Sequence, residues 1–162
     1  MSLEQYAYLA EIIAAVAVVP SLLYLAMQVR QSNAQGQAAA RYAFVQAMGD
    51  INMAVAEDKE VASVWRRGLR SSESLDEDEI MQLWMLMGQY ANAWMVMYQL
   101  HLEGLLPDNH WTVVRNDMLG ILASDGGKAF WKIGAGAFDQ GFRKFVDELL
   151  QTDDKPYDML AR

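Results

Sequence analysis

The feature that most constrains the fold is an uninterrupted apolar segment near the N-terminus, Ala7 to Met27. Its 21 residues include a single charged side chain, Glu11. A helix that crosses ~30 Å of hydrocarbon needs about 20 such residues, so the segment predicts one membrane span. A cleaved signal peptide fits less well, because the six preceding residues carry only Glu4 where a basic region is expected. A buried core helix is a further alternative, since Glu11 and Pro20 are unfavourable in a lipid-facing helix.

The charges beside this segment predict its orientation. Arg30 and Arg41 are the charges in the 20 residues that follow it, whereas Glu4 precedes it. Positive residues tend to stay on the cytoplasmic side. We therefore expect a single-pass protein with its N-terminus outside and its C-terminal domain in the cytoplasm. The expected domains are a transmembrane helix at 1–30, a helical bundle at 31–151 and a flexible tail at 152–162.

One face of the apolar helix is predicted to contact another helix. Small and then polar residues recur on it at heptad-like spacing, and bulky residues such as Ile12, Val16 and Leu23 lie opposite. Within lipid the hydrophobic effect does not drive helices together, so small residues that allow close backbone approach are the usual contacts. The alternative is that alanine is simply common in bacterial spans. The predicted association face consists of Ala7, Ala10, Ala14, Ala17, Ser21, Tyr24 and Gln28.

Glu11 lies beside the association face, about one turn inside the expected outer boundary of the membrane. A carboxylate at this depth can extend toward the headgroups, which is the simpler interpretation. If several copies assemble through the association face, Glu11, Tyr24 and Gln28 would form rings around a central axis. Such rings suit a cation path, so a homo-oligomeric channel with Glu11 and Gln28 as polar sites is the alternative hypothesis.

The rest of the chain predicts a bundle of helices. Apolar residues recur at helical spacing, and charged or glycine-containing corners separate the stretches. Residues 31–56 form the first, with Ser32, Asn33 and Gly36 as the points where it would break. The following expected elements are a short helix with Val61 to Leu69, a helix begun by a Ser74 and Glu77 capping box, a helix capped by Asp108, a turn at 124–127, a short helix with Phe130 and Trp131, a turn at 134–136 and a helix at 139–150.

Residues 80–102 contain no Asp, Glu, Lys or Arg and are long enough for a second span. A polar stripe of Gln82, Gln89, Asn92 and Gln99 argues against that, because hydrocarbon penalises these groups. Both ends are acidic and provide no basic interfacial anchor. We interpret this stretch as the central helix of the bundle.

The charge of the chain after Gln31 excludes most nucleic-acid partners. This part carries 12 Lys and Arg against 19 Asp and Glu, a net charge of −7 that opposes binding to phosphates. One basic cluster, Arg66, Arg67 and Arg70, is expected to face solvent and to complement a helix C-terminus, with contact to anionic headgroups as the alternative.

No recognisable catalytic or metal motif occurs. Cysteine is absent, which removes thiolate nucleophiles and cysteine-ligated zinc. His101, Glu103, Asp108 and His110 are of ligand type but match no established metal spacing. We therefore expect no enzyme activity, no metal and no cofactor.

Several segments carry a resemblance to known sequences. They are the N-terminal apolar segment ending in Gln28-Val29-Arg30-Gln31, then Trp65 to Leu69, Glu103 to Leu106, Phe130-Trp131 and Phe142 to Val146. With these, nearly the whole chain resembles a set of small uncharacterised bacterial proteins with one N-terminal membrane span followed by a helical domain. The resemblance implies a single-pass helical protein of the bacterial cytoplasmic (inner) membrane, and no activity or functional residue comes with it. Residues 80–102 depart from the pattern, since scattered charges are expected there.

These observations lead to one functional expectation. We expect a membrane-anchored helical interaction protein that self-associates, or docks on a membrane complex as a subunit, through the association face. Its expected partners are the lipid bilayer and a second helix, and nucleic acid is not among them.

Overall fold

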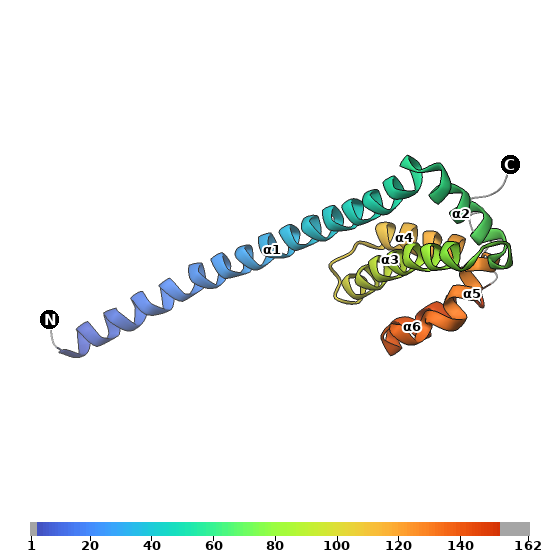
Figure 1. Cartoon of the computed structure of the whole chain (residues 1–162). Coiled ribbons are helices and arrows are strands. Elements are labelled where there is room, and N and C mark those ends of the chain that lie inside the picture. The colour runs from blue at the N-terminus through green and yellow to red at the C-terminus, as the bar shows by residue number, and fades with distance from the viewer. Residues whose placement is uncertain (1–2, 153–162) are drawn as a thin grey trace. The chain divides into compact units, whose positions relative to one another are not determined.

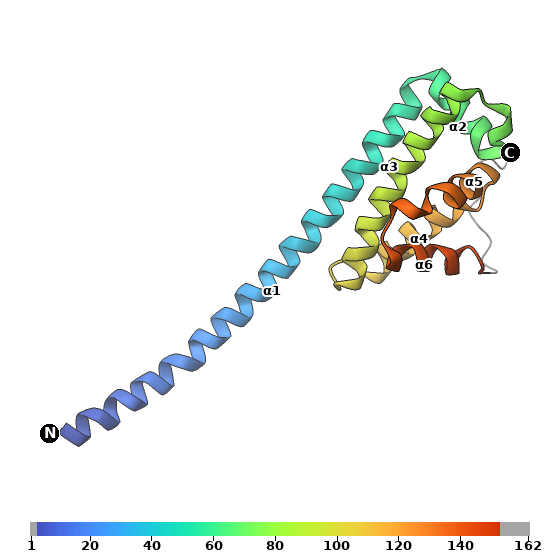
Figure 2. The ribbon, with the colours of Figure 1, turned by 60° about the horizontal axis from the view of Figure 1, so that its bottom comes forward.

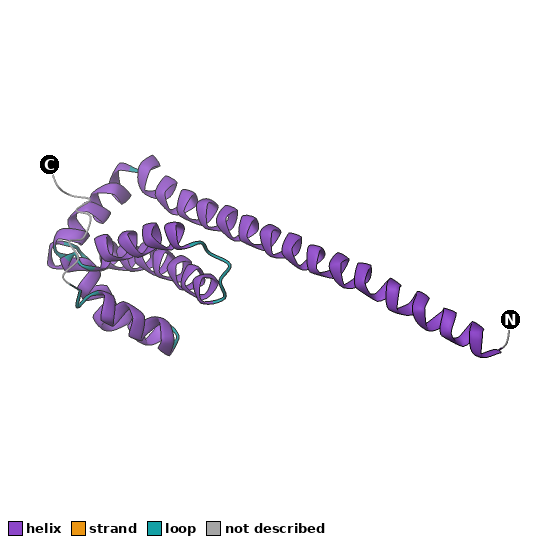
Figure 3. Ribbon diagram, turned by 180° about the vertical axis from the view of Figure 1, so that it is seen from behind, coloured by secondary structure: helices purple, strands orange, loops and turns teal. Residues whose placement is uncertain are grey.

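The structure is a computed structural model that describes residues 3–152, with the backbone alone at residues 9, 10, 14 and 15. Within this range it consists of helices joined by short loops and contains no strand, which confirms the all-α class (Figure 3). The chain divides into two compact units, Met1–Ala39 and Ala40–Arg162. Apart from Thr152, the predicted tail lies outside the described residues.

The apolar segment belongs to one long helix, α1 (Leu3–Glu57), which supplies the whole described part of the first unit (Figure 1). The helix continues through Ser32, Asn33 and Gly36, so the three weak helix formers do not interrupt it. Each costs no more than about 1 kcal/mol relative to alanine, which the helical neighbours offset. Pro20 also lies inside the helix, where a proline removes one backbone hydrogen-bond donor.

The second unit contains the remaining helices and the end of α1. In chain order they are α2 (Lys59–Arg70), the 3-10 turn η1 (Ser72–Ser74), α3 (Glu77–Leu102), α4 (Asp108–Leu122), α5 (Asp125–Gly134), the 3-10 turn η2 (Ala135–Ala137) and α6 (Gln140–Leu149). The central element is α3, which packs against α2, α4 and α5 (Figure 2). Among the described residues, α1 is the helix long and apolar enough to cross a membrane, and α3 does not qualify. This outcome agrees with the interpretation of 80–102 as a bundle helix.

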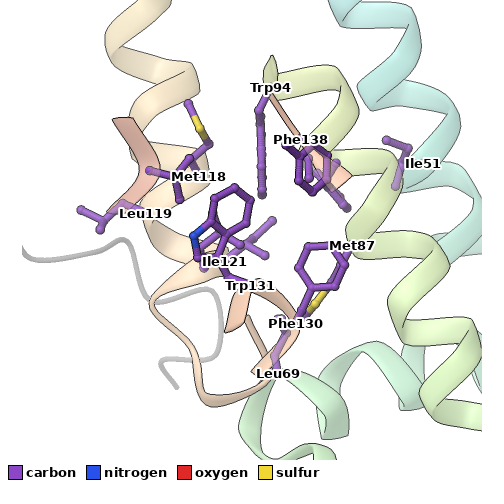
Figure 4. Packing of buried hydrophobic residues seen from close by; sticks show 14 of the residues in the cluster. Ile51, Leu69, Met87, Trp94, Met118, Leu119, Ile121, Phe130, Trp131 and Phe138 are labelled. Atoms are coloured by element: carbon purple, nitrogen blue, oxygen red, sulfur yellow. The ribbon is translucent and has the colours of Figure 1, made fainter. Parts of the chain in front are cut away.

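The core forms around one side of α3. Its buried residues there include Leu83, Met87, Trp94 and Met97, spaced so that they recur on one face. Met118 and Ile121 of α4 and Phe130 and Trp131 of α5 gather with Met87 and Trp94 in the interior (Figure 4). Each fully buried apolar side chain of this size contributes roughly 1.5–3 kcal/mol, so this cluster is the main source of the unit's stability.

Helix starts are set by capping side chains, and two of the predicted caps are wrong. The capping box of α3 uses Asp76 and Glu79, not Ser74 and Glu77: the Glu79 amide donates to Asp76 Oδ1 at 2.9 Å, and the Asp76 amide donates to Glu79 Oε2 at 3.2 Å. Ser74 instead belongs to η1, where its hydroxyl donates to the Ser71 carbonyl. The buried Leu75 lies between the two elements, and α3 begins at Glu77 after its N-cap Asp76.

The N-cap of α4 is Pro107, and Asp108 is the first residue of the helix. Asp108 therefore does not cap through its side chain, although a carboxylate in the first turn still favours the helix dipole. Asp139 does cap α6, because its carboxylate accepts a hydrogen bond from the Phe142 amide at 3.0 Å.

The predicted turn at 124–127 is the beginning of α5. Ser124 caps this helix by accepting a hydrogen bond from the Gly127 amide, and Gly126 and Gly127 are buried in its first turn. A Cβ atom on Gly126 would lie 2.0 Å from the carbonyl oxygen of Gly68 in α2. These glycines therefore serve close helix packing, which a turn prediction from composition does not anticipate.

Candidate functional site

The apolar segment of α1 is the part of the first unit with a clear functional signal. None of the described side chains in its most apolar window is buried, and bulky ones such as Val16, Leu22 and Leu23 are about 60% exposed or more. The alternative of a buried core helix is therefore not what the structure shows. Contiguous apolar surface of this kind is the mark of a membrane or protein contact. By length and composition the segment fits a membrane anchor or a signal sequence.

The predicted association face lies on one uninterrupted helix. Because α1 has no break, the heptad-like spacing keeps all residues of the association face on one side of the helix. They form a narrow stripe along it. Ala7, Ala17, Ser21, Tyr24 and Gln28 are all exposed. The side chains of Ala10 and Ala14 lie outside the described residues.

The polar members of the association face form hydrogen bonds inside the helix. The Ser21 hydroxyl donates to the Ala17 carbonyl at 2.8 Å, and Gln28 Nε2 donates to the Tyr24 hydroxyl at 3.2 Å. These contacts reduce the cost of placing a hydroxyl and an amide in an apolar medium. Close approach of a second helix would then depend on the small side chains more than on polar contacts.

Glu11 is exposed on the flank of the association face. At 100° per residue it lies 40° around the helix from Ala7, as the sequence spacing predicts. The hydroxyl of Tyr24 accepts a hydrogen bond from Gln28.

The second unit contains polar contacts that the sequence did not reveal. Tyr90 donates its hydroxyl proton to Asn52 Oδ1 at 2.6 Å, which ties α3 to α1 within this unit. Trp94 Nε1 donates to Asp117 Oδ2 at 2.9 Å and ties α3 to α4. Both aromatic rings are buried. These bonds satisfy polar atoms that would otherwise destabilise the interior.

Burial changes the acid–base properties of this polar cluster. Loss of hydration raises the pKa of Asp117, while the Trp94 hydrogen bond opposes that increase. Burial, and secondarily the negative charge of Asp117, raises the pKa of Tyr90 to about 12. Tyr90 therefore remains a hydrogen-bond donor at neutral pH. Asp117 was not among the site residues predicted from the sequence. The available signal is its position three residues after Val114 and next to Met118, which places it beside the apolar face of α4.

The basic cluster on α2 is divided by the fold. Arg66 and Arg70 are exposed, as expected, but Arg67 is half-buried and forms an ion pair with Glu79 of α3. The Arg67 guanidinium also donates to the Ser74 carbonyl at 2.9 Å. Its hydrogen bond to Glu79 is the main reason that the pKa of this carboxyl is lowered. The prediction of three solvent-facing arginines is thus wrong for Arg67, which links α2 to α3 and to the turn between them.

The ligand-type residues near the end of α3 have other contacts. The His101 ring stacks on Trp111 with centroids 4.6 Å apart, and His110 Nδ1 lies 3.0 Å from Asn109 Oδ1. Between residues 3 and 152, no group of three or more His, Asp or Glu side chains is placed to hold a metal ion.

No family model, curated protein or solved structure matches this chain.

Proposed function

We propose that this chain is a membrane-anchored helical interaction protein that associates through the association face of α1, either with a second copy or with a membrane complex. The observation that carries the proposal is the fully exposed apolar segment on a helix that continues into a separately packed unit. Lipid is the environment in which such a segment is stable without a protein cover.

An anchor agrees better with the sequence than a cleaved signal does. The region before the segment lacks a positive charge, and the apolar run is longer than the ~7–15 residues of a signal-peptide core. The helix also continues past the segment without the interruption that a cleavage site favours. An intact mass that includes Met1 to Arg30 in membrane-extracted protein would support the anchor, and a shortened chain would contradict it.

Self-association is testable by disulfide cross-linking because the chain has no cysteine of its own. Ala17→Cys places a thiol on the association face, and Val19→Cys places one 200° further around the helix as the matched control. In oxidised membranes we expect a covalent dimer for Ala17→Cys and little for Val19→Cys. Equal cross-linking of the two variants would contradict the face.

A second measurement tests whether the protein associates through this face at all. The mass of the gently solubilised particle should exceed that of one chain, and Ala17→Leu, which blocks close backbone approach, should reduce it. A mass equal to one chain in both proteins would remove the proposal. Ion conduction that disappears with Glu11→Gln would favour the channel alternative instead.

A further inference from the structure

The part of α1 that belongs to the second unit carries bulky apolar side chains on its outer surface. Tyr42 is 71% exposed, Val45 is 68% exposed and Met53 is 51% exposed. At Gly49, which lies among them, no atom comes within 4 Å of an added Cβ atom, so space is open above the helix there. At 100° per residue the four residues occupy an arc of about 80°. We call this surface the outer stripe: Tyr42, Val45, Gly49 and Met53.

The outer stripe points away from the core of its own unit. Phe44, Met48 and Val55 pack against that core, and Ile51 is buried in it. These four residues are centred about 130° around α1 from the outer stripe. The described neighbours within the unit therefore leave the stripe uncovered. Bulky apolar side chains that gather on one helix face, rather than lie scattered singly, mark a contact surface.

The spacing of the outer stripe continues that of the association face. Multiples of seven residues separate Gln28 from Tyr42 and Gly49, and they also separate Tyr24 from Val45. All these positions belong to one unbroken helix. Residues seven apart in a helix drift by only about 20°, which a shallow left-handed supercoil of two helices compensates. A helix that pairs along the association face is thus suited to pair along the outer stripe as well.

A second copy of the chain is the partner that fits the outer stripe. Two copies that enter the membrane with the same topology run parallel, so each stripe residue meets the residue of the same number. A charge at such a position would repel its counterpart. The charged residues of this part of α1 are Arg41, Asp50 and Glu57, and all three lie outside the arc of the stripe. Associated anchors also raise the effective concentration of one stripe near the other, so a small surface suffices.

We propose that two copies of the chain pair through the outer stripe, parallel and in register, so that the contact between anchors continues into the second unit. The pairing rests on the proposed function and deepens it, because it specifies a second copy as the partner. Tyr42 packs on the Tyr42 of the other copy, as aromatic pairs favour. Gly49, which has no side chain, lets the two backbones approach closely.

Cysteine cross-linking of the full chain in oxidised membranes tests the pairing, since the chain has no cysteine of its own. Tyr42→Cys and Met53→Cys place a thiol on the outer stripe. Ala43→Cys and Ala54→Cys are the matched controls, because each is exposed, adjacent in sequence and about 100° further around the helix. We expect a disulfide-linked dimer for the two stripe variants and little for the controls. Equal cross-linking within each matched pair would overturn the proposal.

Ala17→Cys in the same experiment separates this pairing from the proposed function. A dimer through Ala17→Cys, with none through Tyr42→Cys or Met53→Cys, would overturn the outer stripe and leave the association face intact. No dimer in any of the three variants would contradict both. Coexpression of two differently tagged Tyr42→Cys chains identifies the partner. We expect a product that carries both tags, and a product that contains a different protein would overturn the second copy as the occupant.

Charge substitution tests whether each stripe residue meets its own counterpart. In the Met53→Cys chain, Tyr42→Glu or Tyr42→Lys alone should lower cross-linking about fivefold or more, because equal charges then face each other. Coexpression of the two versions should restore a mixed dimer, because opposite charges then meet. Ala43→Glu is the control and should have no effect. Because Tyr42 is exposed, thermal unfolding should remain unchanged. Equal cross-linking in all these combinations would overturn a parallel pairing in register.

Discussion

Asp117 illustrates how one residue on the edge of an apolar helix face acquires a special environment. Its carboxyl accepts a hydrogen bond from Trp94, and burial raises its pKa. A carboxyl whose pKa is higher in the folded than in the unfolded chain binds its proton more tightly in the folded state. Its favourable contribution is therefore complete below the unfolded pKa of about 3.9 and is lost as the pH rises through the folded pKa.

Replacing Asp117 by Asn should stabilise the protein at pH 7. The amide oxygen can still accept the Trp94 hydrogen bond, and the cost of burying a negative charge is removed. The gain should decrease as the pH falls through the raised folded pKa of Asp117, because the carboxyl then becomes protonated and neutral. Urea unfolding at several pH values measures this. Asp147→Asn is the matched control, because Asp147 accepts a hydrogen bond from Trp131 but is exposed. A gain for Asp147→Asn equal to that of Asp117→Asn would contradict burial as the cause.

Gly126 of α5 lies against the backbone of α2 at Gly68. Since an added Cβ would lie 2.0 Å from the Gly68 carbonyl oxygen, the backbone must move to accept it. We expect Gly126→Ala to destabilise the bundle by about 1–3 kcal/mol or more. Gly88→Ala in α3 is the control, because no atom lies within 4 Å of its added Cβ, and it should stabilise by up to about 1 kcal/mol. Thermal unfolding compares the two, and a stable Gly126→Ala protein would contradict the close crossing.

At the scale of elements, α1 changes its surroundings along its length. Up to Met27 its described bulky side chains are exposed and apolar. Beyond Ala40, Phe44, Met48 and Val55 pack against the core of the second unit, and Ile51 is buried in it. One continuous helix therefore serves as an anchor candidate in one part and as a bundle component in another. The two parts of α1 differ in their side chains, because the backbone is α-helical throughout.

Charges within the apolar segment should release the protein from the membrane. Each central arginine opposes insertion by about 2.5–3.5 kcal/mol, so Val16→Arg combined with Val19→Arg opposes it by about 5–7 kcal/mol. The control pair, Gln31→Arg with Gln35→Arg, adds the same charge outside the segment. Carbonate extraction should leave the control in the membrane pellet and move the double valine variant to the supernatant. Wild-type protein in the supernatant would contradict the anchor itself.

For the whole molecule, the predicted topology follows from Arg30 and Arg41 on one side of the apolar segment and Glu4 on the other. It is directly measurable because the chain has no native cysteine. In intact spheroplasts, an impermeant maleimide should label Leu3→Cys, which lies in front of the segment. Glu73→Cys, on the exposed corner after α2, should react only after lysis. The reverse pattern would place the second unit outside the cytoplasm.

Much of the fold was predictable because it depends on local sequence. The periodicity of apolar residues predicts the bundle helices. The caps of α3 and α4 were wrong by one or two residues, since several Ser and Asp side chains compete for each helix start. The association face was readable from spacing alone, although its contact with another helix remains a prediction.

The sequence by itself determined the apolar segment, its length and the helical class, because hydrophobicity and period are properties of neighbouring residues. Only the tertiary structure decided which distant residues meet. It paired Arg67 with Glu79, placed the partly buried Asp117 beside Trp94, and brought Gly126 against Gly68. It also formed an apolar cavity between α1, the α3–α4 loop and α4. Such contacts depend on how helices pack across the chain, and helical periodicity specifies which face is buried without specifying its neighbour.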